Sequence, residues 1–452
     1  MRAVAAALFL AVAFPAHADV LIDNVNGLTL DEDGRVDHFN GVLVGDDGRI
    51  EQVLSRRDKR PGNVDYRFDA KGRVLIPGLI DSHVQVMKLG LSLLTREEAA
   101  PASQDGRTLP PPRPEDRDAA LAKAQQLLLA QGITAVADMG TTIEDWQAYR
   151  RAGDLGRLNL RIVAYAAGPE AMALIGGPGP TPWLYGDRLR LNGLFLALDG
   201  TLANRTAALK APYADDPAST GRAGLTETQL KNLMSRGAID NFQVAVSASG
   251  DGAVATVLDA IEELKGTYTG DRRWRIERTQ VVDPADMARI GSYGVSLSMQ
   301  PQLAETDRAV AEARLGPERL ASAQPWKSLA ASGAVLAFGS SAPDKAPRPF
   351  AGMAQAITRQ DGYGQPFGGW QPQERLTREA ALAAYTTGAA HALLADGRLG
   401  RIARGERGDF VLVDRDPLLA TPDELRAIQV LQTWVGGKLV YEAKESAPAE
   451  GR

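Results

Sequence analysis

An apolar run early in the chain reads Val74-Leu75-Ile76-Pro77-Gly78-Leu79-Ile80, and Asp81-Ser82-His83 follow it directly. A strand that is buried on both faces of a parallel sheet is almost continuously apolar. In α/β proteins, polar residues at the carboxyl end of such a strand lie where active sites are built. The run therefore predicts one buried parallel strand that ends at a functional face.

Similar apolar runs recur along the chain and alternate with helical patterns. The strand candidates are 133–138, 160–166, 194–198, 243–246, 275–279, 295–299 and 335–338, and the clearest helical patterns between them are 117–130, 225–234 and 253–264. Repeated strand–helix units predict an α/β protein with a (β/α)8 TIM-like barrel, whose active face lies at the strand carboxyl ends. A doubly wound open sheet is the alternative.

The two ends of the chain share a pattern of short apolar runs and turns that differs from the strand–helix alternation of the middle. Asp33-Gly34 and Asp47-Gly48 separate runs near the amino end, and Asp-Gly pairs favour tight hairpins. Strand-like runs return near the carboxyl end at 408–414 and 430–441. We therefore expect a small composite β-sandwich from residues 19–75 and 396–445, a barrel over 76–395 and a disordered tail over 446–452.

Composition excludes several classes of function. The 452 residues include 51 Lys and Arg against 56 Asp and Glu, a net charge of −5, so the basic excess of a nucleic-acid binder is absent. Without Cys, the chain has no disulfides, thiolate metal sites or Cys nucleophile. It has four histidines, His17, His38, His83 and His391, too few for a histidine-rich metal site.

The amino end resembles an export signal. Arg2 precedes an apolar run that ends in Ala16-His17-Ala18, a pattern typical of a signal peptide over residues 1–18. We expect an exported, periplasmic protein; an uncleaved helix is the alternative. No later run has the roughly 18 apolar residues of a membrane span, and the proline-rich stretch 101–114 is expected to be an exposed loop or a mobile lid.

From Ile76-Pro77-Gly78-Leu79-Ile80-Asp81-Ser82-His83-Val84 onward, the chain resembles the amidohydrolase superfamily and, more narrowly, its amidohydrolase-3 branch of metal-dependent C–N hydrolases. The resemblance runs from residue 19 to about 442. Its other segments are 199–202, 205–209, 212–213, 243–246, Arg275-Ile276-Glu277, 298–301, 337–340, 386–390 and 435–437. It implies a metal-binding barrel beside a composite β-sandwich.

The resemblance also implies one or two divalent ions at the barrel mouth. Family ligands are an HxH pair after strand one, a carboxylated Lys on strand four, one His each on strands five and six, and an Asp on strand eight. Such an ion lowers the pKa of a bound water toward neutrality. In this chain the matching positions are His83, Gln85, Phe195, Ser247, Arg278 and Ser341. Only His83 keeps the family's ligand type, so we expect no family-type metal centre and no cofactor, with zinc as the alternative.

Arg278 suggests how the charge at the mouth is replaced. With the ions and the anionic ligands both lost, its guanidinium can stand where the metal stood and bind a ligand carboxylate with its planar fork. The alternative is that Arg278 only balances a neighbouring carboxylate, for which the candidates are Asp81, Glu277 and Asp251.

The residues that could bind a ligand at the mouth are His83, Arg278, Asp81 and Asp138. His83 is alternatively a hydrogen-bonded core residue. Ser247 and Ser341 have no apparent His-Asp relay, which argues against a serine-hydrolase triad, and no catalytic residue is assigned. We expect Asp199 to brace its loop.

Two functional classes remain open from the sequence. The first is a non-catalytic amidohydrolase-like protein that binds a small ligand, either as a homo-oligomer or in partnership with an active relative. The second is a hydrolase of C–N bonds other than peptide bonds (amide, formamide or cyclic amide) that works through a rebuilt site. Metal content and substrate turnover distinguish them.

Overall fold

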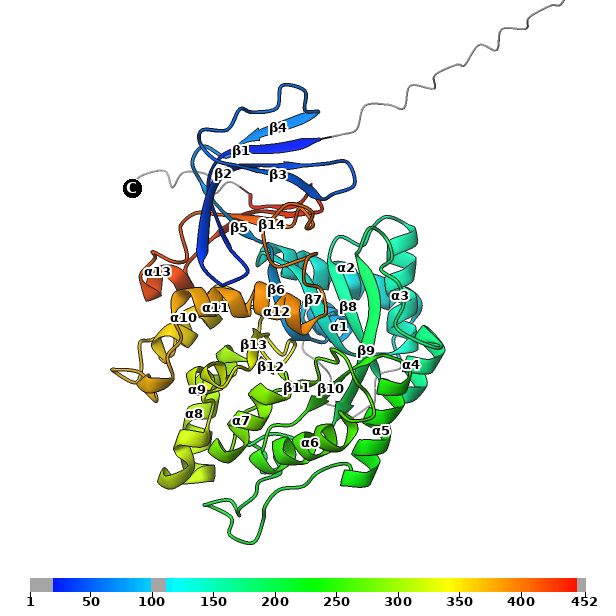
Figure 1. Ribbon diagram of the computed structural model, residues 1–452, viewed down its shortest axis with the longest axis vertical. Coiled ribbons are helices and arrows are strands. Elements are labelled where there is room, and N and C mark those ends of the chain that lie inside the picture. The colour runs from blue at the N-terminus through cyan, green and yellow to red at the C-terminus, as the bar shows by residue number, and fades with distance from the viewer. Residues whose placement is uncertain (1–18, 99–110, 445–452) are drawn as a thin grey trace, which may run out of the picture.

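The computed structural model describes residues 19–98 and 111–444, which form a barrel and a smaller β domain (Figure 1). The predicted signal peptide (1–18), the predicted tail (446–452) and most of the proline-rich stretch 101–114 lie outside the described residues. Within the described ranges, no helix has the length and apolar character to cross a membrane.

The barrel is an eight-stranded parallel sheet whose strands lie in chain order. Its strands are β6 (Leu79–Val84), β7 (Ile133–Thr141), β8 (Arg161–Ala167), β9 (Leu189–Ala197), β10 (Gln243–Ser247), β11 (Arg275–Glu277), β12 (Ser296–Met299) and β13 (Val335–Phe338). A parallel bridge between Val84 and Ala342 joins the first strand to the segment after the last. The predicted (β/α)8 barrel is confirmed, and the open-sheet alternative is wrong.

Helices follow the strands and surround the sheet (Figure 1). They are α1 (Val86–Glu98), α2 (Pro114–Ala130), α3 (Ile143–Asp154), α4 (Pro169–Gly176), α5 (Glu227–Ile239), α6 (Asp251–Leu264), α7 (Pro284–Ser292), α8 (Ala304–Leu315), α9 (Trp326–Ala331), α10 (Pro349–Thr358), α11 (Arg378–Ala384), α12 (Thr387–Ala392) and α13 (Pro422–Arg426). Thr226 begins α5 by accepting a hydrogen bond from the Gln229 amide, as a capping box requires.

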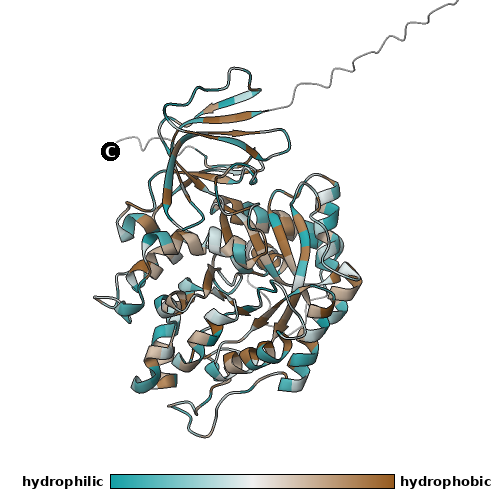
Figure 2. Cartoon of the chain, viewed as in Figure 1, coloured by the Kyte–Doolittle hydropathy of each residue, from teal (hydrophilic) through white to brown (hydrophobic). Residues whose placement is uncertain are grey.

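The barrel interior is a small apolar core closed at the amino ends of its strands. Ala135 and Ala245 from the sheet pack with Leu393, next to α12, in one buried cluster. The carbonyl of Ala392, at the end of α12, accepts a hydrogen bond from Gln243, the first residue of β10. Helix α12 therefore plugs the barrel opposite the functional face. In Figure 2 the barrel strands are mostly brown, as buried parallel strands should be.

The smaller domain combines both ends of the chain, as expected. Its strands are β1 (Val20–Leu30), β2 (Val36–Val44), β3 (Ile50–Leu54), β4 (Tyr66–Asp69), β5 (Val74–Pro77), β14 (Phe410–Val413), β15 (Val430–Val435) and β16 (Lys438–Glu442). They lie in the order β16-β15-β14-β5-β1-β2-β3, with β4 on β1. Strand β5 joins the two halves because it pairs with β1 on one side and with β14 on the other.

The prediction of one strand across Val74-Leu75-Ile76-Pro77-Gly78-Leu79-Ile80 is wrong, because the run forms two strands in two sheets. The chain crosses between the sheets at Gly78, whose amide donates to the Asp409 carbonyl at 2.9 Å. A Cβ at Gly78 would lie 2.2 Å from Thr134 Oγ1, so only glycine fits this crossing. Apolarity alone does not reveal the break, since both strands are fully buried.

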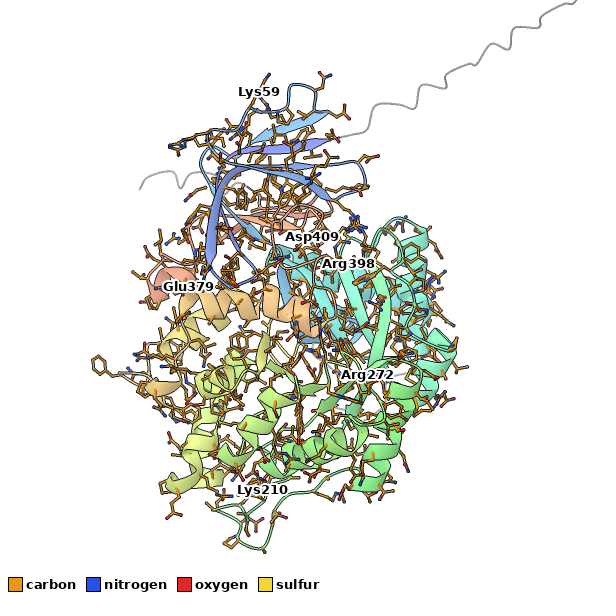
Figure 3. All side chains as sticks on the ribbon, viewed as in Figure 1. Lys59, Lys210, Arg272, Glu379, Arg398 and Asp409 are labelled. Carbon is orange, nitrogen blue, oxygen red and sulfur yellow. The ribbon has the colours of Figure 1, made fainter. Side chains whose placement is uncertain are left out.

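A buried ion pair fastens the domains together. Arg161, which begins β8, donates from Nε and Nη2 to the two carboxylate oxygens of Asp409, at 2.6 and 2.7 Å. Their side chains are 1% and 5% exposed. Figure 3 labels Asp409 and Arg398 in this region, between the β domain and the barrel.

Candidate functional site at the barrel mouth

The predicted family ligand positions lie at or just beyond the carboxyl ends of barrel strands. His83 and Gln85 are at the end of β6, Phe195 is near the end of β9, and Ser247 ends β10. Arg278 follows β11 directly, and Ser341 lies in the segment after β13 that closes the barrel. The fold therefore gathers the six positions at one end of the barrel.

His83 is buried and held by a carboxylate that sequence reasoning did not select as a partner. Its Nδ1 lies 2.8 Å from Glu277 Oε2, and the side chains of the two residues are 4% and 0% exposed. With Nδ1 bound to the carboxylate, the imidazole presents Nε2 as its other polar atom. No partner for Nε2 exists within residues 19–98 and 111–444.

Glu277 is itself bound by Arg275, two residues earlier on the same strand. Arg275 Nε donates to Glu277 Oε1 at 2.8 Å, and both side chains are completely buried. Burial alone would raise the pKa of Glu277, but the charge of Arg275 and the hydrogen bond with His83 outweigh it, and the pKa lies below its ordinary value. Glu277 is therefore an ionised anchor for His83.

The Arg275 guanidinium extends this hydrogen-bond network into the barrel interior. It donates to the Tyr165 hydroxyl at 3.0 Å, to the Ala392 carbonyl at 3.1 Å and to the Ser82 carbonyl at 2.9 Å. The sequence signal for this network was two charged residues at alternate positions of a strand, Arg275 and Glu277, which must share one face.

Three of the other family positions carry neutral groups with local contacts. Gln85 Nε2 donates to the Met139 carbonyl at 3.1 Å. The ring of Phe195 meets the imidazole of His83 edge-on, with centroids 6.1 Å apart. Ser247 is buried at the end of its strand.

Ser341 contacts Asp344 rather than a histidine. Its Oγ lies 3.4 Å from Asp344 Oδ2, and its backbone amide donates to the His83 carbonyl at 2.8 Å. In the described part of the chain neither Ser247 nor Ser341 hydrogen-bonds a histidine side chain, so no serine relay is assembled.

Arg278 is paired, but not with any of the expected carboxylates. Its Nη1 donates to Asp344 Oδ2 at 3.2 Å, and the two side chains are 25% and 53% exposed. The prediction that Asp81, Glu277 or Asp251 balances it is therefore wrong. Asp344 lies on the segment after β13, near Ser341. The fold brings this segment close to the end of strand six, and the sequence does not reveal that contact.

Asp81 and Asp138, two of the candidate ligand-binding residues, are occupied by protein donors. Asp81 Oδ1 accepts from the amides of His83 at 3.1 Å and Ser340 at 2.9 Å. Asp138 accepts from the Val86 amide at 2.8 Å and, as its other contacts, from the hydroxyls of Thr141 and Tyr149 at 2.6 and 2.9 Å. Burial raises the pKa of Asp81, and it raises that of Asp138 to about 6. Both carboxyls brace strand ends.

Two further carboxyls, Asp199 and Asp307, feel the charge of Arg278. Asp199 accepts from the amides of Ser249, Gly250 and Ala208 at 2.8, 3.0 and 2.9 Å, in line with the bracing role expected for it. Asp307 Oδ2 accepts from Gln280 and Gln324 at 2.7 and 3.0 Å. Burial raises the pKa of each to about 6, against the lowering influence of Arg278.

The remaining histidines lie apart from this site. His38 is exposed within β2. His391 lies in α12, which follows α11 after a break, and its Nδ1 lies 3.1 Å from Asp396 Oδ1.

The donor set at the mouth does not fit the family's metal centre. The six positions offer one imidazole, an amide, two hydroxyls, a phenyl ring and a guanidinium, whereas zinc prefers several nitrogen or anionic ligands. His83 also commits Nδ1 to Glu277. Across residues 19–98 and 111–444, no three or more His, Asp or Glu side chains are grouped so that they could hold a metal ion.

Comparison with known proteins agrees with the barrel fold. Residues 91–441 match the model of the amidohydrolase family. A Bacillus subtilis protein named as an amidohydrolase, YtcJ, is 32% identical over 259 residues, which are 57% of this chain and 49% of that protein. The N-substituted formamide deformylase of Arthrobacter pascens is 26% identical over 322 residues, 70% of this chain and 58% of the deformylase.

The chain thus spans about half the length of the curated relatives it matches. The crystal structure of an uncharacterized metal-dependent hydrolase from Pyrococcus horikoshii superposes with a TM-score of 0.77 at 22% identity, covering 90% of this chain and 99% of the other. That likeness concerns the fold. The match to the family model covers most of the sequence, and the chain therefore belongs to the amidohydrolase family.

Proposed function

We propose that this protein binds a small anionic ligand at its barrel mouth and does so without the metal centre of its family. The observation that carries the proposal is that two groups lie at the same end of the barrel: His83, which Glu277 anchors, and the cation Arg278 at the strand-six ligand position. We further propose that the mature protein is exported to the periplasm, on the evidence of the signal-like residues 1–18.

Arg278 is suited to exchange its present partner for a ligand. Its only ion pair in the described ranges joins one guanidinium nitrogen to Asp344, which is 53% exposed. Exposed pairs of this kind contribute roughly 0–1 kcal/mol. A ligand carboxylate can bind the planar guanidinium through two parallel hydrogen bonds, which are individually stronger. His83 Nε2 offers a second polar contact on the same side of the barrel.

A second candidate is a hydrolase of amide, formamide or cyclic-amide bonds that uses His83 as its base. The specific support is the contact between Nδ1 and Glu277, which fixes the tautomer that leaves Nε2 able to accept a proton. A relative named as an N-substituted formamide deformylase adds to this support by association.

The first test is elemental analysis of the purified protein together with calorimetric titration of small mono- and dicarboxylates. We expect less than stoichiometric zinc after dialysis. Binding of at least one carboxylate should weaken roughly tenfold or more in Arg278→Leu, because a charged hydrogen bond is removed. Arg236→Leu, which removes a helix-surface arginine paired with Asp240, is the matched control and should bind normally. Stoichiometric zinc with chelator-sensitive turnover would overturn the proposal.

The second candidate is tested with the same protein and a panel of amides, formamides and cyclic imides. Turnover that survives a chelator and is abolished in His83→Asn would establish it. Glu277→Gln should then lower kcat and shift the pH profile, because the amide cannot stabilise a protonated imidazole as a carboxylate does. No turnover of any panel member above that of His83→Asn would reject it.

A further inference from the structure

A small cavity lies behind the barrel wall, between α8, α9, α10 and the loop that follows α10. Its volume is about 10 Å³, and its lining includes Arg308, Trp326, Arg359, Asp361 and Trp370. Room of this size accommodates about one water-sized group. The cavity is separate from the family ligand positions, none of which lines it.

Arg359 is buried in this cavity without an ionic partner. Its guanidinium carbon lies 4.2 Å from the ring centroid of Trp326 and 5.2 Å from that of Trp370, and the residue is 4% exposed. Nε donates to the Trp370 carbonyl and Nη1 to the Gln324 carbonyl, at 3.0 and 3.2 Å. Within the described ranges Nη2 has no partner.

Two carboxylates near this arginine accept hydrogen bonds from other groups. Asp361 Oδ1 accepts from the amides of Tyr363 and Gln365, both at 2.8 Å. Glu374, whose charge acts on Arg359, accepts from the amide and hydroxyl of Ser328 at 2.9 and 2.6 Å. Burial lowers the pKa of Arg359 to about 10, which still leaves it charged at neutral pH.

Two further side chains on the cavity wall add to its affinity for negative charge. Arg308 is partly exposed and forms no ion pair in the described part of the chain. The Trp326 indole N–H, in a side chain 1% exposed, likewise has no acceptor among the described residues. A buried charge without a counter-charge is strongly unfavourable, so a stable fold normally supplies one.

We propose that this cavity is a site for one monatomic anion, a halide ion such as chloride, held by Arg359 Nη2 with Arg308 on the cavity wall. The anion would supply the missing counter-charge, and the small volume would exclude sulfate and phosphate. Asp361 also lines the cavity, and its negative charge favours an anion of single rather than double charge.

The site adjoins the barrel mouth through one shared side chain. Trp326 also lines a second cavity of about 10 Å³, together with Arg278 and Asp307. An anion beside Arg359 would therefore fix an indole that also lines the cavity next to Arg278. The inference does not depend on the ligand proposed for Arg278, since it rests on different residues.

Chloride-35 NMR line broadening on the full chain, in a gluconate background of constant ionic strength, tests the site. We expect saturable excess broadening that is lost in Arg359→Gln and reduced several-fold in Arg308→Gln. Arg378→Gln is the matched control, because Arg378 donates to a backbone carbonyl and lies outside the cavity. Bromide should displace the chloride, whereas acetate, which is larger than the cavity, should not; displacement by acetate would contradict a site of this size.

Crystals of the wild-type protein grown in bromide provide a test that does not depend on a variant folding. An anomalous peak within hydrogen-bond distance of Arg359 Nη2 is expected. A water molecule there at saturating bromide, or chloride broadening that is equal in the wild type and in Arg308→Gln, would overturn the proposal.

Discussion

His83 shows how a single side chain can be retained while its chemistry changes. The family resemblance makes this residue a metal ligand, yet here its Nδ1 is bound to Glu277, which Arg275 holds in turn. An imidazole between a buried carboxylate and an open barrel end acts as a hydrogen-bond donor or proton acceptor. Its role therefore follows from its neighbours on β11 as much as from its own identity.

Asp138 gives a pH-dependent prediction. Burial raises its pKa from the ordinary value of 3.8 to about 6, so between these values the folded protein holds a proton that the unfolded chain releases. Its stabilising contribution is therefore present below about pH 4 and is lost as the pH rises through 6, by roughly 3 kcal/mol.

Urea unfolding of wild type and Asp138→Asn checks this expectation. Between about pH 4 and 7 the wild type should lose roughly 3 kcal/mol more unfolding free energy than the variant, whose neutral amide does not titrate. Thr141 and Tyr149 can accept from the new amide, since hydroxyls reverse their roles. Asp423→Asn, at a side chain 93% exposed, is the control. Parallel curves for wild type and Asp138→Asn would contradict the argument.

Which residues stand at the mouth could be predicted, whereas their partners could not. Order along the chain and strand position placed His83, Arg278 and Ser341 at the same end of the barrel. The pairing of Arg278 with Asp344 depends on how two loops pack, and no periodicity encodes that. The anchor Glu277 could have been found from its alternation with Arg275 on a buried strand.

Among the elements, β13 and β6 approach each other closely at the seam where the barrel closes. Gly339, directly after β13, lies so close to β6 that a Cβ there would be 2.5 Å from the His83 amide nitrogen and 2.8 Å from Asp81 Oδ1. Neither neighbour can move freely, because both belong to the first barrel strand. The seam therefore requires a residue without a side chain.

Gly339→Ala should destabilise the protein by roughly 1–3 kcal/mol, the usual cost of overpacking a close contact. Thermal and urea unfolding measure the loss, and a changed environment of His83 should appear in its NMR signals. Gly266→Ala is the matched control, because no heavy atom lies within 4 Å of its added Cβ. Equal unfolding free energies for the two variants would show that β13 and β6 can separate enough to accept the added methyl group, which would contradict the argument.

Apolar runs predicted the elements well and their breaks poorly. The seven later barrel strands overlap the predicted runs, because apolar side chains are concentrated in these short segments between helices, although β9 begins before the predicted run 194–198. Two breaks were not predicted: one separates β5 from β6, and the other separates α11 from α12. Their positions depend on where the chain passes from one packed layer to the next. Burial continues across both breaks, so the hydrophobic pattern does not mark them.

At the scale of the whole molecule, the Arg161–Asp409 pair couples the barrel to the β domain. Arg161→Met should cost roughly 3–5 kcal/mol of unfolding free energy, because it leaves the buried Asp409 carboxylate without its counter-charge and with the Gly436 amide as its remaining donor. Arg205→Met breaks an exposed pair with Asp215 and should cost at most about 1 kcal/mol. Urea unfolding of both variants provides the comparison, and similar losses would mean that the buried pair does not hold the domains together.

The composite sheet also imposes an order of assembly during translation. Strand β5 leaves the ribosome before any barrel strand, but its neighbour β14 is synthesised only after β13. Until then the nascent half-sheet carries an unpaired edge at β5, where another chain could add. The barrel can close meanwhile, so β14 to β16 complete the molecule last.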